Sequence, residues 1–409
     1  MLRDMHSYIR RPHAATQVAL TARQVAAAYN FPMAQASGQG YIAGIVELGG
    51  GFDPAQVNAF LQSQGLPAIN LTSVNVGRGS NRSDGPDGAD GEVQLDIVVA
   101  GSIATSANFR VYFGGNSDAD FLAALKQALA ECHGVSVSWG QAESQWVSAS
   151  MNAFEAVIKE ARGRGVPTFV ASGDSGSTDS TSTNTVDFPS SSPSAIGCGG
   201  TTLTLTADGA RATETVWNDN PTQSATGGGV SRHFPGRDVP DIAGNADPDT
   251  GYKVGIDGTT GVVGGTSAVA PLMLALHALV WELSAGRPFD FLNLIVTNPQ
   301  ACFDVTSGDN GGFRAGPGRD QTTGFGVPDG VKLLAALTGG IAPPVPPGPP
   351  VVTPPVVPPP VVTPPADPLS TFPLAAVQLW ELHKHNYTLA ERNAADAVAA
   401  WARSVGLAL

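Results

Sequence analysis

Short apolar runs alternate with stretches of helical pattern through the first half of residues 17–340. Strands this apolar, separated by helices, imply a parallel sheet that helices cover on both faces. The candidate strands are YIAGIVEL (41–48), LTSVNV (71–76), FRVYFG (109–114), GVSVSWG (134–140) and VPTFVASG (166–173), with helical stretches near 53–64, 89–104, 118–131 and 147–163. The order predicts an α/β fold whose active site lies beyond the carboxyl ends of the strands.

The composition argues against several classes of function. The 409 residues include 22 Lys and Arg against 35 Asp and Glu, and a net charge of −13 disfavours a nucleic-acid-binding surface. The three cysteines, Cys132, Cys198 and Cys302, are too few for a disulfide framework and match no zinc spacing. No apolar run approaches a membrane span. Only 14% of the residues are charged, so acid neutralises the carboxylates without large self-repulsion, a hint of acid tolerance.

Composition also divides the chain into four segments. Residues 1–16 predict a polar, irregular N-terminal arm without the apolar core of a signal peptide. Residues 17–340 predict the globular domain. Residues 341–368 predict an extended proline-rich linker, since 343–368 hold 14 of the 32 prolines. Residues 369–409 repeat apolar residues at helical spacing and predict a small helical appendage of unknown function.

Two carboxylates share one face of the predicted helix at 89–104. Glu92 and Asp96 are four residues apart, and the same face continues through apolar residues such as Val99. Like charges at this spacing destabilise a helix slightly when exposed and more when buried. Taken alone, the pair fits a solvent-facing position near a helix start, where carboxylates are favoured. Because apolar residues continue along the same face, a second interpretation stays open, in which the two carboxylates form a coupled pair inside a functional site.

Two further segments place reactive side chains beside glycines. In VPTFVASGDSGSTDS (166–180) a buried strand ends in a turn carrying Asp174, either as a turn residue bonded to its own backbone or as a carboxyl at the sheet edge. In GVVGGTSAVAPLMLALHALVWEL (261–283), Ser267 stands where a long apolar helix begins. A serine there usually caps the helix. The alternative is a nucleophile, because the glycines admit a substrate carbonyl and helix-end N–H groups hold an oxyanion.

The seven histidines offer Ser267 no evident base. Four of them lie outside residues 17–340, and His133 and His233 have no motif around them. His277 follows Ser267 by ten residues in the same predicted helix, which favours a core or surface role. A histidine triad is therefore unsupported, and a nucleophilic Ser267 would need a carboxylate as its base.

Eight segments occurring in order resemble the sedolisin family of serine-carboxyl peptidases, particularly its kumamolisin-like members. They are IVELGGGFD (45–53), GEVQLDI (91–97), SVSWG (136–140), ASGDSGSTD (171–179), DFPSSSP (187–193), PDIAGNADPDTGY (240–252), GGTSAVAPL (264–272) and AGPGRDQTTGFGVPDG (315–330). The resemblance covers roughly 17–338, and the ordered set is more specific than any one segment. It implies a subtilisin-like α/β fold with a changed catalytic triad.

The resemblance implies a role for each candidate catalytic residue. Ser267 is expected to be the nucleophile, Glu92 the general base, and Asp96 the residue that orients Glu92. Asp174 is expected in the oxyanion hole, where only a protonated carboxyl can donate a hydrogen bond to the developing charge. Aspartate ordinarily titrates near about pH 3.9, so this role requires acid, burial or both. The implied activity is an endopeptidase that works in acid on unfolded or denatured proteins.

The resemblance extends to a supporting network and a substrate pocket. Glu47, at the end of the first strand, and Trp139, at the end of SVSWG, match positions that extend the catalytic network. Asp179 matches a position that lines the substrate pocket, which suggests a preference involving a basic side chain. Protein or peptide substrates and a monomeric enzyme are expected.

One structural calcium ion is also implied by the resemblance. Asp304 and Asp320 are expected to supply carboxylates, and Val305, Gly316 and Gly318 backbone carbonyls. Oxygen-only ligands on a glycine-rich loop suit a hard cation. Without the resemblance, the same residues fit an ordinary turn cluster of aspartate and glycine.

A second hypothesis is a non-catalytic, secreted binding or adhesion module on the same fold. Sedolisins normally carry a signal peptide and a long prosegment, whereas only residues 1–16 precede the predicted globular domain here. That departure and the linker with its appendage, which an unidentified partner could bind, motivate the hypothesis. The presence of all four catalytic residue types argues against it. The resemblance implies an extracellular protein with no nucleic-acid or membrane partner.

Overall fold

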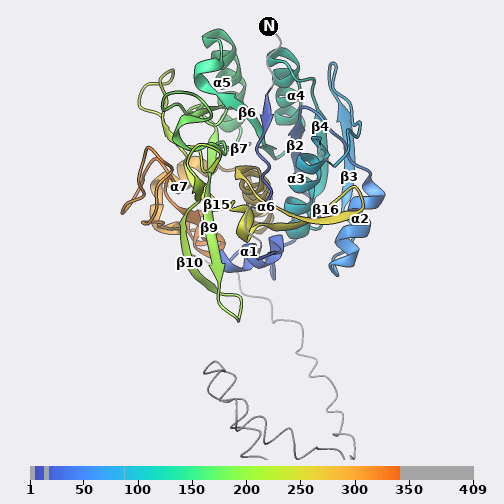
Figure 1. Cartoon of the computed structure of the whole chain (residues 1–409). Coiled ribbons are helices and arrows are strands. Elements are labelled where there is room, and N and C mark those ends of the chain that lie inside the picture. Colours follow the sequence, from blue (N-terminus) through green and yellow to red (C-terminus); the bar gives the residue numbers. More distant parts are fainter. Residues whose placement is uncertain (1–4, 13–17, 87, 341–409) are drawn as a thin grey trace, which may run out of the picture. The chain divides into compact units, whose positions relative to one another are not determined.

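A computed structural model describes residues 5–12, 18–86 and 88–340 (Figure 1). An eight-stranded sheet runs through this part of the chain. From one edge to the other its strands are β10 (Arg211–Val216), β9 (Ile196–Leu205), β7 (Thr168–Ala171), β5 (Gly134–Val137), β2 (Ile42–Glu47), β4 (Asn108–Phe113) and β3 (Asn70–Asn75), and β15 (Ile242–Asn245) also pairs with β9. Every pairing is parallel except that of β10 with β9.

Helices cover both faces of the sheet, as the sequence predicts. One face packs into a large apolar cluster with α1 (Ala22–Ala28), α2 (Pro54–Ser63), α3 (Asp90–Ile103), α6 (Val269–Leu283), α7 (Phe291–Thr297) and α8 (Gly330–Thr338). The other face packs against α4 (Asp118–Glu131) and α5 (Ser148–Gly163). Figure 1 shows α3 and α6 close to the middle of the molecule. The predicted helices at 53–64, 89–104, 118–131 and 147–163 are confirmed within a residue or two.

The run GVSVSWG does not form one strand. Strand β5 ends at Val137, and after Ser138 the chain enters β6 (Trp139–Ala142), which belongs to a separate three-stranded sheet in the order β1-β6-β8. Strand β8 spans Asp187–Phe188 and β1 spans His6–Ser7. The prediction of an irregular arm over residues 1–16 is therefore wrong at His6–Ser7, because their backbone groups pair with β6.

Helix α6 is the most apolar element. The expectation that no apolar run approaches a membrane span is wrong by length and composition for Thr266–Leu283, which has a mean hydropathy of 1.4, but 83% of this stretch is buried inside the protein. Burial against the sheet explains its composition, since a helix that is apolar all round fits a protein core as well as a membrane. In the described part of the chain it is the one helix that meets these criteria.

Short elements connect these layers. They are η1 (Glu143–Gln145), η2 (Gly176–Thr178), β11 (Asn218–Asn220), β12 (Ser224–Ala225), β13 (Gly229–Val230), β14 (Asp238–Val239), η3 (Pro248–Thr250), β16 (Tyr252–Ile256), β17 (Thr259–Val263), η4 (Thr266–Ala268), η5 (Pro299–Ala301), β18 (Cys302–Phe303) and β19 (Val327–Pro328). The predicted linker at 341–368 and the predicted appendage at 369–409 lie outside the described residues.

Candidate active site

The predicted catalytic residues come from elements that meet at the carboxyl edge of the sheet. Glu47 ends β2, Asp174 follows β7, and Trp139 begins β6. Ser267 lies in η4, immediately before α6, and helix α3 passes beside η4 with Glu92 and Asp96. This arrangement agrees with the expectation that a parallel sheet places its site beyond the strand ends.

Helix α3 is fixed at its beginning by Asp90, a residue that the sequence interpretation missed. Its carboxylate accepts hydrogen bonds from the backbone N–H groups of Gly51 (2.6 Å), Asp84 (3.2 Å) and Gly85 (2.9 Å). An aspartate that gathers loop N–H groups at a helix start holds the helix in register. The position of Glu92, two residues later, depends on this anchor.

Glu92 and Asp96 are fully buried, so the interpretation of a solvent-facing pair is wrong. Burial raises the pKa of Glu92 well above its ordinary value, and the Asp96 carboxyl raises it further. The nearby Ser267 hydroxyl lowers the same pKa, although the two groups do not reach full hydrogen-bond geometry. Catalytic contacts often tighten only when substrate binds, so this looseness is compatible with a base and its nucleophile.

Ser138 connects Asp96 to the loop that carries Ser267. Its hydroxyl lies 2.8 Å and 3.0 Å from the two Asp96 oxygens and 3.3 Å from the backbone carbonyl of Ser267. Burial raises the pKa of Asp96, the Glu47 charge adds to this, and the Ser138 hydrogen bond opposes both. The sequence displays Ser138 inside SVSWG, but nothing in that motif distinguishes it from Ser136.

Glu47 and Trp139 form a buried pair. The indole Nε1–H of Trp139 donates to Glu47 Oε2 at 2.7 Å, and Glu47 Oε1 has no partner. Burial raises the pKa of Glu47 well above its ordinary value, and the neighbouring Glu92 raises it further. The carboxyls of Glu47, Glu92 and Asp96 therefore interact, and their protons belong to the group as a whole.

Ser267 does not cap helix α6. The helix begins at Val269 without a side-chain cap, and the buried Ser267 hydroxyl has no hydrogen-bond partner. Gly265 precedes it with φ +110°, a conformation that L side chains rarely adopt. The cap interpretation is therefore wrong, and the glycine turn leaves the hydroxyl unbonded in the site.

Asp174 is held by the loop that carries Thr266 and Ser267 rather than by its own turn. Its Oδ1 accepts hydrogen bonds from the Thr266 backbone N–H and the Thr266 hydroxyl, both at 2.8 Å. Burial raises its pKa to about 6, against opposing effects of Arg10 and Thr266. Its second oxygen, Oδ2, has no hydrogen-bond partner but lies 3.8 Å from Arg10 Nε. The interpretation of a self-bonded turn aspartate is wrong, since Thr266 lies 92 positions away.

Two more buried carboxyls adjoin Asp174. Asp179 has φ 43°, and burial, reinforced by Asp174, raises its pKa to about 7. Burial raises the pKa of Asp187 well above its ordinary value, with Asp179 adding to the effect. The phenol of Tyr8 donates to Asp187 Oδ2. The sequence interpretation missed Asp187 and Tyr8, because neither residue belongs to a recognisable pair along the chain.

His277 does not take part in this site. It lies buried in α6, where its Nδ1 is 2.6 Å from the Tyr41 hydroxyl and its ring packs against Phe289. Burial lowers its pKa to about 3. The predicted core role fits these contacts.

The residues expected to bind calcium gather on one loop system. Asp304 Oδ2 accepts from the Gly318 N–H at 2.8 Å, and Asp320 Oδ2 accepts from the Gly316 N–H at 3.0 Å. The Thr323 hydroxyl lies 3.4 Å from both the Val305 carbonyl and Asp320 Oδ2. The structure thus places the two carboxylates against the glycine N–H groups of one loop system, and the residue types offer the oxygen ligands that suit a hard cation.

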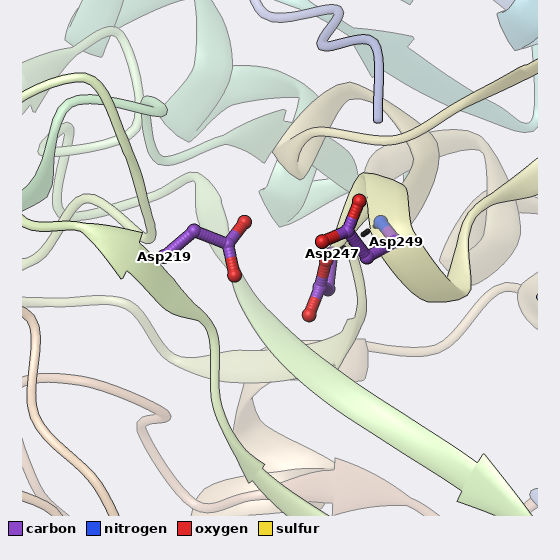
Figure 2. Close-up of side chains that lie close together, drawn as sticks. All are labelled: Asp219, Asp247 and Asp249. Atoms are coloured by element: carbon purple, nitrogen blue, oxygen red, sulfur yellow. Dashed lines mark hydrogen bonds between the residues drawn. The ribbon is translucent and has the colours of Figure 1, made fainter. Parts of the chain in front are cut away.

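A second group of carboxylates was not anticipated from the sequence. Oxygen atoms of Asp219, Asp247 and Asp249 lie within 4.8 Å of one another (Figure 2). Burial raises the pKa of Asp247 to about 6, despite the Thr202 hydrogen bond that opposes it. These oxygens already accept hydrogen bonds, including 2.9 Å from Trp217 Nε1 to Asp219 and 2.7 Å from Asp249 N to Asp247. The cluster could hold a metal ion.

Comparisons with curated proteins identify relatives over most of the chain. Kumamolisin of Bacillus sp. (strain MN-32) is 44% identical over 362 residues, covering 80% of this chain and 65% of kumamolisin. Sedolisin of Pseudomonas sp. (strain 101) is 31% identical over 338 residues, covering 72% of this chain and 57% of sedolisin. The chain therefore spans less than two thirds of the length of either protein. No family model matches the chain.

The fold has a close counterpart among solved structures. Pseudomonas sedolisin, a serine-carboxyl proteinase complexed with two molecules of pseudo-iodotyrostatin, matches with a TM-score of 0.72 and 28% identity. The match covers 80% of this chain and 100% of that chain. A central parallel sheet with helices on both faces is thus shared over the whole of that protein, which confirms the subtilisin-like α/β architecture expected from the sequence.

Proposed function

The chain belongs to the sedolisin family of serine-carboxyl peptidases, and on this basis we propose that it is an acid-active endopeptidase with Ser267 as its nucleophile. The observation that carries the proposal is the set of buried carboxyls around one unbonded serine. Glu92, Asp96 and Asp174 are each fully buried, and their charges interact. Burying three acids costs stability, and such arrangements are typical of catalytic sites.

In the proposed reaction, Ser267 Oγ attacks the carbonyl carbon of a substrate peptide while Glu92 accepts the hydroxyl proton. Asp96, held by Ser138, orients Glu92 and shares its proton. Glu92 then returns the proton to the leaving amine, and a water molecule hydrolyses the resulting ester by the same route. A carboxylate base works in acid only while it is ionised. Burial and the Asp96 charge raise the pKa of Glu92 well above its ordinary value, and the Ser267 hydroxyl offsets only part of this rise.

Asp174 is proposed to stabilise the oxyanion. Below about pH 6 its carboxyl is neutral and can donate a hydrogen bond, whereas above that value its charge would repel the oxyanion. The two Thr266 hydrogen bonds to Oδ1 leave Oδ2 as the oxygen that carries the proton. Activity in acid then requires Asp174 to be neutral while the interacting carboxyls of Glu92 and Asp96 still hold one negative charge between them.

Asp179 is proposed to line the substrate pocket. It lies beside Gly173, whose added Cβ would stand 3.1 Å from Asp179 Oδ1, so it adjoins the oxyanion residue Asp174. Its pKa of about 7 leaves it neutral in acid. A basic substrate side chain arriving there would favour the carboxylate form, because an opposite charge lowers a carboxyl pKa. This effect supports the suggested preference for a basic side chain.

The experiment that tests the function is cleavage of a denatured protein from about pH 3 to about pH 8. The parent, Ser267→Ala and the control Ser80→Ala, which changes an exposed serine, are compared at equal concentration. We expect the parent and Ser80→Ala to digest the substrate only in acid, and Ser267→Ala to be inactive. Equal digestion by Ser267→Ala and the parent would refute the proposal.

A structural calcium ion is proposed at Asp304, Val305, Gly316, Gly318 and Asp320. When bound, it would join the loop after β18 to the loop before β19. Saturation at a hundredfold excess over the dissociation constant stabilises a protein by about 2.7 kcal/mol, so for a folded unit of this size chelation should lower Tm by roughly four degrees.

Two variants decide where that ion binds. Asp320→Asn should abolish the effect of the chelator on Tm, whereas Asp247→Asn, in the second carboxylate group, should retain it. Loss of the effect in Asp247→Asn alone would place the ion at the Asp219, Asp247 and Asp249 cluster instead.

A further inference from the structure

The turn after β8 is held by a buried ion pair that the proposed reaction does not use. Arg237 and Asp241 are both buried, and the guanidinium meets the carboxylate through two hydrogen bonds, Nη1 to Oδ1 and Nη2 to Oδ2, the second at 2.7 Å. Among the described residues, Arg237 Nε has no hydrogen-bond partner. A buried ion pair that leaves one donor unbonded is a weak source of stability, so stability alone does not account for it.

The carboxylate end of this pair is fixed in the fold. Asp241 Oδ2 accepts a hydrogen bond from the Gly197 N–H at 2.8 Å, and the Asp241 N–H donates to the Gly197 carbonyl at 2.9 Å. The Asp241 carbonyl accepts from the Phe325 N–H at 2.8 Å. Asp241 is therefore held both by β9 and by the loop before β19, and the guanidinium that pairs with it is held in place as well.

Arg237 connects this anchor to the turn after β8. Its Nη2 also donates to the Ser190 carbonyl at 2.9 Å, across 47 positions of the chain. The Ser190 hydroxyl donates to the Asp187 carbonyl at 2.9 Å, and the Ser191 N–H donates to the same carbonyl at 3.0 Å. The planar fork of a guanidinium can hold a carboxylate and a carbonyl at once, which an ammonium group does less precisely. One side chain thus fixes a turn whose own hydrogen bonds close on Asp187.

Asp187 places a buried carboxyl beside Asp179, the acid proposed to line the substrate pocket. A Cβ added at Gly173 would stand 3.1 Å from Asp179 Oδ1 and 3.5 Å from Asp187 Cβ, so both acids adjoin the residue before Asp174. Asp187 Oδ2 accepts from the Tyr8 phenol, and Oδ1 has no hydrogen-bond partner among the described residues. Asp187 can therefore receive a side chain that carries a hydroxyl. Because Asp174 is the proposed oxyanion residue, that side chain belongs to the substrate residue whose carbonyl is attacked.

We propose that Arg237 is a positioning residue for substrate selection, which holds the Asp187 carboxyl through the Ser190 carbonyl and so sets the preference for a hydroxyl-bearing side chain before the cleaved bond. The proposal rests on the peptidase function above. Arg237 does not touch the substrate and acts only through the turn. Without its guanidinium, the Ser190 carbonyl loses its donor and the turn can shift. The hydrogen bond between Asp187 and the substrate hydroxyl then weakens, because such bonds depend steeply on distance and angle.

The test compares two peptides that differ in a single phenol hydroxyl, with either Tyr or Phe as the residue before the cleaved bond. Mass spectrometry confirms which bond is cut, and the ratio of the two kcat/KM values measures recognition of the hydroxyl. Both peptides meet the same enzyme sample, so the ratio does not depend on how much of a variant is folded. A purely structural role of Arg237 would lower both kcat/KM values together and leave their ratio unchanged.

The parent should cleave the Tyr peptide about five- to tenfold better than the Phe peptide, the effect of one hydrogen bond. Arg237→Met should reduce this ratio to about twofold or less. Arg237→Met combined with Asp241→Asn leaves no charge of the pair buried, which favours folding, and should show the same loss. Arg162→Met is the matched control, because Arg162 Nε lies 3.0 Å from both oxygens of Asp290 and its Nη1 is 3.5 Å from the Pro193 carbonyl. This control should keep the parent ratio.

Three results would overturn the proposal: a parent that cleaves both peptides equally well, a parent-like ratio in Arg237→Met or in the double variant, or the same loss in Arg162→Met. Ser267→Ala separates these failures from failure of the function. If it cuts neither peptide while the parent cuts them, the peptidase function stands and only the role of Arg237 is refuted. If it cuts them as the parent does, or if the parent cuts neither the peptides nor a denatured protein, the function is refuted together with that role.

Discussion

At the scale of single residues, the sequence shows the side chains proposed to be catalytic but not their partners. Glu92, Asp96, Asp174 and Ser267 could be selected because motifs in a fixed order surround them. For each of these residues the sequence also allowed an ordinary structural role, such as a helix cap for Ser267. Those interpretations fail because the four residues come together only in the folded protein. The hydrogen bonds from Ser138 and Thr266 could not be predicted, since hydroxyl residues occur throughout the chain and their contacts span tens of residues.

Ser138→Ala tests whether the Asp96 hydrogen bond matters to the reaction. A hydrogen bond to a charged group contributes about 1.5–3 kcal/mol, so kcat/KM should fall about ten- to a hundredfold. The Ser138 hydroxyl favours ionised Asp96, so its loss should also raise the pKa of the carboxyl pair and move the acid limb of the pH–rate profile upward. Steady-state kinetics across the pH range measures both effects.

Ser136→Ala is the matched control for this variant. Ser136 is buried in the neighbouring strand β5, and its hydroxyl has no hydrogen-bond partner. Its kinetics should match the parent. If both variants lose activity equally, the loss comes from replacing a small buried residue and not from removing the hydrogen bond to Asp96.

At the scale of elements, strand and helix positions follow closely from apolar patterning. The sequence did not predict the break at Ser138, because Ser136 to Gly140 keeps strand-like residues while the chain leaves one sheet for another. It also did not predict η4, since a glycine pair followed by Thr and Ser resembles a helix cap. The hydrogen bond that fixes this turn runs from the Thr266 N–H to the Asp174 carboxyl and joins distant parts of the chain.

Gly265→Ala tests the turn that positions Ser267. Gly265 has φ +110°, and an added Cβ would stand 2.6 Å from Asp174 Oδ2, so the turn must shift. A displacement of about 1 Å at a catalytic group can cost about a hundredfold, and we expect a loss of that order in kcat/KM. Gly261→Ala, in β17, is the control because its Cβ would meet nothing within 4 Å. Unchanged kinetics in Gly265→Ala would contradict the positioning role.

At the scale of the whole molecule, the small share of charged residues and the excess of acidic over basic ones suggest acid tolerance. The buried carboxyls supply a physical cause for it. Burial raises the pKa of Asp174 to about 6 and of Asp179 to about 7. The folded protein therefore keeps these protons to a higher pH than the unfolded chain, whose aspartates titrate near about 3.9. The composition could not show which of the 35 acidic residues are buried.

The free energy of unfolding should therefore fall as pH rises. The contribution of these groups is complete below about pH 4 and is lost progressively up to about pH 7, by a few kcal/mol in total. Urea unfolding at several pH values measures this slope. In Asp179→Asn the side chain at position 179 cannot ionise. The free energy of unfolding of this variant should therefore depend less on pH in the upper part of that range. A free energy of unfolding that increases from about pH 4 to about pH 7 would contradict the account.

The pH–rate profile of Asp174→Asn tests the central claim most directly, namely that a neutral side chain at position 174 is needed. An asparagine amide donates a hydrogen bond but does not titrate, and it has nearly the shape of the carboxyl. We predict that the parent loses activity as pH rises through about 6, whereas Asp174→Asn shows no fall in that range, even at a lower maximal rate. The same fall at the same pH in both proteins would show that another group sets the acid optimum, and would contradict the account.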